Sequence, residues 1–174
     1  DQGQSEAALR IQHVVVNSSE LEGAPENCFA TVYRFEPTAG ARAFRYEDGY
    51  YKGDFAKKET SYWRQYFSSL ANAYGEDYDG YYSGWKSSMD LEVSADGFYY
   101  YDVTFWDVSM ANETFEVIYM AYDADGVPGV PACYTVTLPA ETPAVTPQQA
   151  PSAYKAAVAA ANRLAHPQAL PRRR

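Results

Sequence analysis

The sequence ADGFYYYDVTFWDV at residues 95–108 decides the class of fold, because six of its fourteen side chains are aromatic. Side chains of a β-strand point alternately to the two faces of its sheet, so a run of this kind divides into two sets. The odd positions from 99 to 105 hold only Tyr, Val and Phe, whereas the even positions place Asp102 and Thr104 among rings. We expect the odd set to face a core and the even set to face outward.

Similar apolar runs recur along the chain as far as residue 138. Rich in Val, Phe and Tyr and separated by polar turns, they predict strands at residues 11–16, 28–35, 43–46, 50–55, 85–93, 98–108, 114–122 and 132–138. Asp48-Gly49, between two of them, predicts a tight hairpin. Strands joined by short turns, without a helix between each pair, favour an antiparallel β-sandwich or curved sheet.

Two segments have the composition of helices. Apolar side chains recur every three or four residues over 60–74, with Tyr62 and Trp63 among them, which predicts one amphipathic helix packed on a sheet. Residues 152–165 are rich in Ala and carry a thin apolar stripe that includes Tyr154. Because so thin a stripe stabilises a lone helix poorly, this second helix should dock on its own domain, on a neighbouring subunit or on another protein.

Composition divides the chain into four parts: a flexible N-terminus at residues 1–10, a β-rich globular domain at 11–138, a Pro-rich linker at 139–151, and a basic Ala-rich helix and tail at 152–174. The net charge is −9, but the last twenty residues hold five basic and no acidic side chains. The remaining part of the chain holds nine basic and 23 acidic residues, which gives it a charge of −14. Such an acidic body repels nucleic acid and attracts basic partners.

Several features predict a secreted or extracytoplasmic glycoprotein. Cys28 and Cys133 lie in strand-like runs near the two ends of the β-rich region, where a disulfide would close a long loop. Asn17 and Asn112 begin N-glycosylation sequons. The polar opening at Asp1 suits a chain whose signal peptide has been removed, and the absence of a long apolar run predicts no membrane span.

The sequence contains no specific catalytic or cofactor motif. Neither His13 nor His166 lies beside a candidate nucleophile, and the Cys and His spacings match no structural zinc site. Phosphate loops and dinucleotide fingerprints are missing, and Asp-Gly turns account for the acidic clusters at 76–80 and 123–126. We therefore expect a non-catalytic protein without cofactor or metal. The enzymatic alternative is a glycoside hydrolase that uses Asp102 and Glu116 as its acid pair.

Aromatic side chains are more numerous than one core of this size needs, since 17 of the 174 residues are Tyr. Exposed Tyr and Trp provide large contact area at protein interfaces, and surrounding carboxylates steer basic partners. The candidate binding residues are Tyr78, Tyr81, Tyr82, Trp85, Tyr100, Asp102, Trp106 and Tyr122. The sequence thus predicts an acidic, tyrosine-rich face for a protein partner, either a basic protein or a neighbouring subunit joined through the C-terminal helix. Carbohydrate binding, with rings stacked on sugars, is the alternative.

Overall fold

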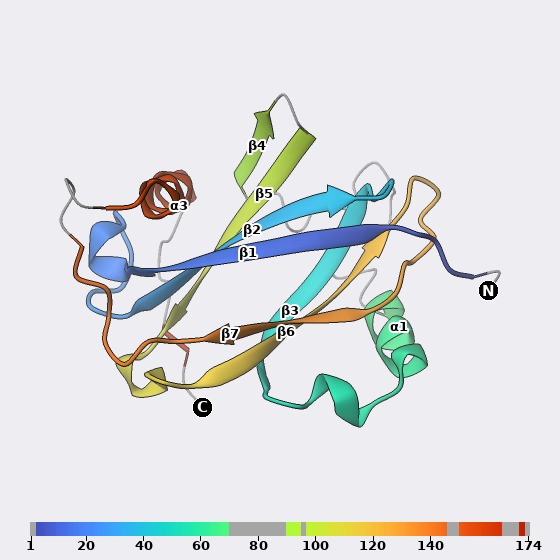
Figure 1. The fold of residues 1–174 in the computed structure, drawn as a ribbon, viewed down its shortest axis with the longest axis horizontal. Helices are drawn as coiled ribbons and strands as arrows, with labels where there is room; N and C mark the ends of the chain where they lie inside the picture. The colour runs from blue at the N-terminus through green and yellow to red at the C-terminus, as the bar shows by residue number, and fades with distance from the viewer. Residues whose placement is uncertain (1–2, 70–89, 95–96, 146–149, 165–170, 173–174) are drawn as a thin grey trace. The chain divides into compact units, whose positions relative to one another are not determined.

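The computed structural model describes residues 3–69, 90–94, 97–145, 150–164 and 171–172 (Figure 1). Within these ranges the chain is mainly β, with antiparallel strand pairs, which confirms the prediction of a mainly β fold. The α-helices among the described residues are α1 (Thr60–Ser69) and α3 (Ser152–Asn162), both at predicted places. Neither of them is long and apolar enough to cross a membrane.

One sheet has four strands in the order β1-β2-β5-β4 (Figure 1). Its members are β1 (Ala8–Asn17), β2 (Phe29–Thr38), β5 (Gly97–Trp106) and β4 (Asp90–Ser94). The strand that contains most of the aromatic run, β5, lies between β2 and β4 and pairs antiparallel with both. Arg34 of β2 lies opposite Tyr101 of β5 in this pairing.

The other sheet has three strands in the order β3-β6-β7, with β3 at Ala43–Tyr51, β6 at Thr114–Tyr122 and β7 at Ala132–Thr137. The predicted hairpin at Asp48-Gly49 is wrong. Strand β3 continues through this dipeptide and pairs with β6 on both sides of it, with a register shift between Glu47 and Tyr50. Gly49 has φ +86°, which only glycine adopts readily, so the dipeptide forms a bulge in a continuous strand.

The described residues group into two compact units. Unit 1 comprises residues 3–10, 36–69 and 114–136, and unit 2 comprises residues 11–35, 90–94, 97–113, 137–145, 150–164 and 171–172. Strands β3 and β6 and helix α1 belong to unit 1, whereas β4, β5 and α3 belong to unit 2.

In unit 1, helix α1 packs on the three-stranded sheet, as the sequence predicts. It contacts β6 and buries Trp63 and Phe67. Arg45 on β3 is fully buried, and its Nη1 donates a hydrogen bond to the Phe67 carbonyl near the end of the helix, at 2.9 Å. A cation at this position also interacts favourably with the helix dipole.

In unit 2, helix α3 packs into a hydrophobic core that includes β2 and β5. The helix contributes Tyr154, Ala157, Ala160 and Ala161 to this core. The Tyr154 hydroxyl accepts a hydrogen bond from the Asn17 N–H and donates one to the Glu20 carboxylate. The apolar stripe of the C-terminal helix is therefore buried within its own unit, a question that the sequence left open.

The predicted disulfide is also wrong, because Cys28 and Cys133 are free thiols. Cys28 lies in unit 2, with its Sγ 3.0 Å from the Ser18 hydroxyl. Cys133 lies in unit 1 and hydrogen-bonds to the Glu116 carboxylate. Each thiol therefore has a polar partner within its own unit, and spacing along the chain carries no information about where the thiols point.

Candidate functional site

The predicted binding residues separate into two groups. Tyr78, Tyr81, Tyr82 and Trp85 lie outside the described residues. Among the others, Tyr100, Trp106 and Tyr122 are only 6%, 2% and 3% exposed, and Asp102 is half-buried. The expectation that Tyr100 and Trp106 face outward is therefore wrong, since both are as buried as the odd-numbered Tyr101 and Phe105.

Trp106 is covered by a residue from the far end of the chain. Its indole N–H donates a hydrogen bond to the Thr31 hydroxyl at 3.0 Å. The guanidinium of Arg172 lies 5.4 Å from the centroid of the Trp106 ring, and Arg172 forms a parallel bridge with Trp106. In the sequence, Arg172 belongs to a basic tail, and nothing local indicated this cover.

Tyr122 and Tyr100 are also buried, and each lies near residues that are distant from it in the sequence. The guanidinium of Arg45 lies 5.5 Å from the centroid of the Tyr122 ring. Tyr100 lies opposite Phe35 in the pairing of β2 with β5, and Phe35 stacks on Tyr33. These rings are core residues of their own units, so the aromatic surface must be sought elsewhere.

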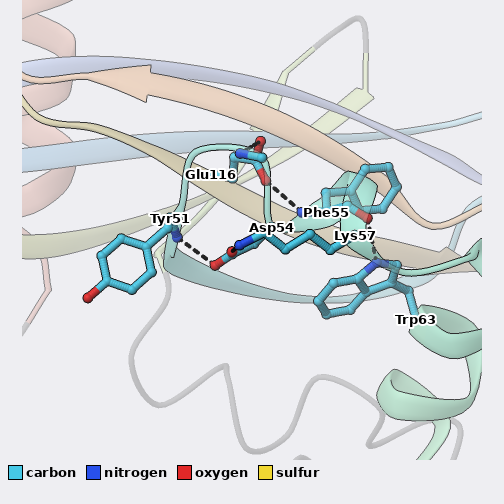
Figure 2. Close-up of polar contacts among 7 residues, drawn as sticks. Tyr51, Asp54, Phe55, Lys57, Trp63 and Glu116 are labelled. Atoms are coloured by element: carbon cyan, nitrogen blue, oxygen red, sulfur yellow. Dashed lines mark hydrogen bonds and ion pairs between the residues drawn. The ribbon is translucent and has the colours of Figure 1, made fainter.

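A loop between β3 and α1 is held by a buried carboxylate (Figure 2). Glu116 is 8% exposed, and its two oxygens accept hydrogen bonds from the N–H groups of Gly53 and Phe55, each at 2.8 Å. The Phe55 carbonyl then accepts from the Trp63 indole N–H at 3.0 Å. Sheet, loop and helix are thereby connected through charge-assisted and main-chain hydrogen bonds.

The same loop has its own internal turn. The Asp54 carboxylate accepts a hydrogen bond from the Tyr51 N–H at 2.8 Å and forms an ion pair with Lys57 at 3.0 Å. In Figure 2 the Tyr51 ring points away from the loop, on the side opposite Trp63. The ring is 60% exposed, so the main chain of Tyr51 is held while its side chain is displayed.

Helix α1 is attached to β3 by a second carboxylate. Glu47 Oε1 accepts hydrogen bonds from the hydroxyls of Tyr50 and Tyr66, both at 2.6 Å. Burial, together with Glu47, raises the pKa of Tyr50, so this hydroxyl stays a proton donor. The Tyr66 ring lies parallel to that of Tyr62, with 6.5 Å between centroids and 6° between planes.

Tyr62 is a second exposed tyrosine of unit 1. The sequence assigned it to the buried stripe of the helix, but Trp63 and Phe67 take the inward positions and Tyr62 is 45% exposed. Its ring meets Trp63 edge-on, and the Lys58 ammonium lies 5.0 Å from its centroid. We call Tyr51 and Tyr62 the exposed tyrosine pair; no sequence signal distinguished them from the other tyrosines.

The hypothetical acid pair of a glycoside hydrolase does not come together within either unit, since Asp102 belongs to unit 2 and Glu116 to unit 1. Asp102 accepts a hydrogen bond from the Val103 N–H, and Glu116 holds the loop described above. Both carboxylates thus bind main-chain groups. In the part of the chain that the structure describes, no three His, Cys, Asp or Glu side chains are grouped to hold a metal ion.

The two sequons differ in accessibility. Asn17 is half-buried, and its side-chain oxygen accepts a hydrogen bond from the Ser19 N–H at 2.9 Å. Asn112 is exposed, with φ +65° after a short 3-10 turn. Glycosylation stays a prediction for both sites, and Asn112 is the more accessible acceptor.

Comparisons with known proteins found no matching family model, no similar curated protein and no similar solved structure. The function is accordingly argued from the chemistry of the described side chains.

The thiol of Cys133 is expected to react slowly. Burial and the nearby Glu116 carboxylate raise its pKa to about 11, from an ordinary value of 9.0. Because only the thiolate is nucleophilic, the alkylation rate of folded protein at pH 8 should be roughly a hundredfold below that of unfolded protein. Iodoacetamide labelling with mass spectrometry, with urea-unfolded protein as the control, measures both rates at Cys133. Equal rates, or a Cys133 that cannot be alkylated without a reductant, would contradict the structure.

Proposed function

We propose that this chain is a secreted, non-catalytic interaction domain that binds a protein partner through tyrosine side chains displayed by unit 1. The observation that carries the proposal is the exposure of Tyr51, at the end of strand β3, and of Tyr62 on helix α1, at 60% and 45%, on elements that are otherwise firmly held. Tyr is favoured at interfaces because its large amphipathic ring loses little conformational entropy on binding.

The support beneath these rings favours binding. Glu116 holds the main chain of the loop, and Glu47 attaches α1 to β3. A surface whose backbone is already ordered does not lose that entropy again when a partner binds. The exposed tyrosine pair is thus presented on a pre-organised scaffold.

Charge and chain order suggest how the surface extends. The net charge of −9 favours a partner with a basic surface. Tyr78, Tyr81, Tyr82 and Trp85 follow α1 in the sequence among acidic residues, and we propose that they belong to the same binding face. We also propose that the two sheets form a sandwich or a curved sheet. A second copy bound through α3 is less favoured, because the apolar stripe of α3 is buried in unit 2.

Carbohydrate binding is the alternative for the same rings. The parallel rings of Tyr62 and Tyr66 resemble a stacking platform, which is the observation in its favour. A sugar, however, needs a free ring face, and the Lys58 ammonium lies 5.0 Å from the Tyr62 centroid. A protein interface tolerates this neighbour, so the geometry favours a protein partner.

The double variant Tyr51→Ser/Tyr62→Ser is expected to lose the partner while the fold is retained. Both side chains are exposed, so the free energy of unfolding should change by less than about 1 kcal/mol. The immobilised chain would be exposed to extracellular fluid from its source, and bound proteins would be quantified by mass spectrometry. We expect at least a tenfold depletion of one specific protein on the double variant. The matched control is Val108→Ser, which alters an exposed apolar side chain of unit 2, 47% exposed.

Two results would count against the proposal. A set of bound proteins that is identical for wild type and the double variant would exclude the exposed tyrosine pair from the interface. Retention of wild type on a polysaccharide column, lost in the double variant, would assign the pair to carbohydrate binding.

A further inference from the structure

Unit 1 contains a cavity of about 340 Å³ between residues 4–9, which we call the N-terminal segment, and the strands β6 and β7. This volume lies within the range of small-molecule sites, roughly 300–1,000 Å³. Besides the N-terminal segment, the described lining comprises Tyr119 and Ala121 of β6, Val130, and Ala132 at the start of β7.

The N-terminal wall of the cavity is held by residues 127–129. Ser5 donates two hydrogen bonds to carbonyls of these residues, one from its N–H and one from its hydroxyl, both at 2.8 Å. Gly129 allows the close approach of the two segments, because a Cβ at this position would lie 2.1 Å from the Ala7 carbonyl oxygen. Residues that are distant in the sequence thereby line one cavity.

The lining is apolar where it is buried and acidic where it is exposed. Ala7, Leu9 and Ala121 are buried, with exposed fractions of 6% or less. Glu6 is exposed, and Val130 is 50% exposed. A ligand can therefore bury an apolar body here while a charged group stays close to solvent.

Two side chains of the lining are suited to a cation. Glu6 is the one charged residue of the described lining, since Arg64, which donates a hydrogen bond to Gln4 at 2.8 Å, is not part of it. Tyr119 is half-buried in the same lining. No hydrogen bond, ion pair or ring contact with the described residues engages the side chain of Glu6 or Tyr119. A carboxylate attracts an ammonium ion through its charge, and an aromatic ring attracts it through its quadrupole.

We infer that this cavity binds a small organic ammonium ion, whose head group is held by the Glu6 carboxylate and the Tyr119 ring and whose apolar body packs against Leu9 and Ala121. At roughly 30 Å³ for each water-sized group, the volume admits about ten non-hydrogen atoms. The net charge of −9 attracts a cation to the chain. The inference is independent of the proposed function, because the exposed tyrosine pair is not part of the lining.

Protonated 2-phenylethylamine is a suitable probe, with 2-phenylethanol and phenylacetate as controls that share its ring and differ in the head group. In an NMR titration of the full chain, the amine is expected to shift the amide resonances of Leu9 and Ala121 along a saturable curve. Both controls should bind about tenfold more weakly, because they lose the attraction to the carboxylate and to the ring.

Two pairs of substitutions test the two groups. Glu6→Gln should weaken binding of the amine roughly threefold. Its control is Glu59→Gln, which removes the same charge at an exposed position of unit 1 outside the lining and should leave the affinity unchanged. Tyr119→Leu should lower the preference for the amine over 2-phenylethanol roughly threefold, whereas Tyr119→Phe keeps the ring and should retain this preference.

Four outcomes would overturn the inference. These are no saturable shifts in the wild type, equal binding of phenylacetate, equal affinity of Glu6→Gln and Glu59→Gln, and equal preference in Tyr119→Leu and Tyr119→Phe. If Tyr119→Leu does not fold, the two glutamate variants still decide, because both positions are exposed. The double variant Tyr51→Ser/Tyr62→Ser should bind the amine as tightly as wild type, so failure of this inference and failure of the proposed function are separately visible.

Discussion

Glu116→Ala is expected to lower the free energy of unfolding by roughly 3–6 kcal/mol, the sum of two hydrogen bonds to a charged group. The substitution leaves the N–H groups of Gly53 and Phe55 without their acceptor, at a position where the carboxylate is only 8% exposed (Figure 2). Water reaches such a site poorly, so the lost bonds are not fully replaced. The loop that follows Tyr51 should loosen first.

Urea denaturation followed by circular dichroism measures the global effect of Glu116→Ala. Hydrogen exchange at the amides of Gly53 and Phe55 gives the local effect, since protection there should fall most. Glu113→Ala is the matched control: it removes an exposed carboxylate just before β6 and should change stability by no more than about 0.5 kcal/mol. If the two variants proved equally stable, the proposed anchoring of the loop would be wrong.

Trp106→Ala is expected to cost about 3–5 kcal/mol, the usual penalty for truncating a buried large aromatic side chain to Ala. Trp106 is 2% exposed, donates to Thr31 and lies beneath the guanidinium of Arg172. The substitution creates a cavity in unit 2 and removes the surface to which the C-terminal segment is attached. A ring displayed for a partner, as the sequence suggested for Trp106, would cost far less.

Thermal and urea unfolding of two further variants tests this prediction. Trp106→Phe keeps an aromatic ring but removes the hydrogen bond to Thr31, so it should fall between wild type and Trp106→Ala. Val108→Ala, two residues further along and 47% exposed, should be close to neutral. A Trp106→Ala protein as stable as Val108→Ala would show that the ring is not a core residue.

Regular elements were largely predictable because their signals are local. Alternation of apolar residues located β5 and β6, the latter at its observed bounds of Thr114–Tyr122, and helical spacing located α1 from Thr60. The Asp48-Gly49 dipeptide was misassigned because a hairpin and a bulge need the same glycine. Pairing with β6 on both sides of Gly49, a contact distant in the sequence, selects the bulge.

The candidate site was much less predictable. Tyr and Trp are typical of binding surfaces, but Tyr100, Trp106 and Tyr122 are buried. Tyr62, in contrast, was assigned to a buried stripe and is exposed. Neither Arg45 nor Glu116 carries a local signal for its role beneath α1 and the loop. The position of these side chains depends on which distant segment covers them.

By itself, the sequence determined that the described part of this protein is mainly β and that α1 and α3 are amphipathic helices, because strand and helix periodicity are properties of neighbouring residues. The tertiary structure alone decided which rings are core and which are displayed, and that both cysteines are free. The physical reason is that the burial of a side chain depends on which other segment of the chain packs against it. Arg172 covers Trp106 and α3 covers the face of Val32 only after the chain has brought together residues far apart in the sequence.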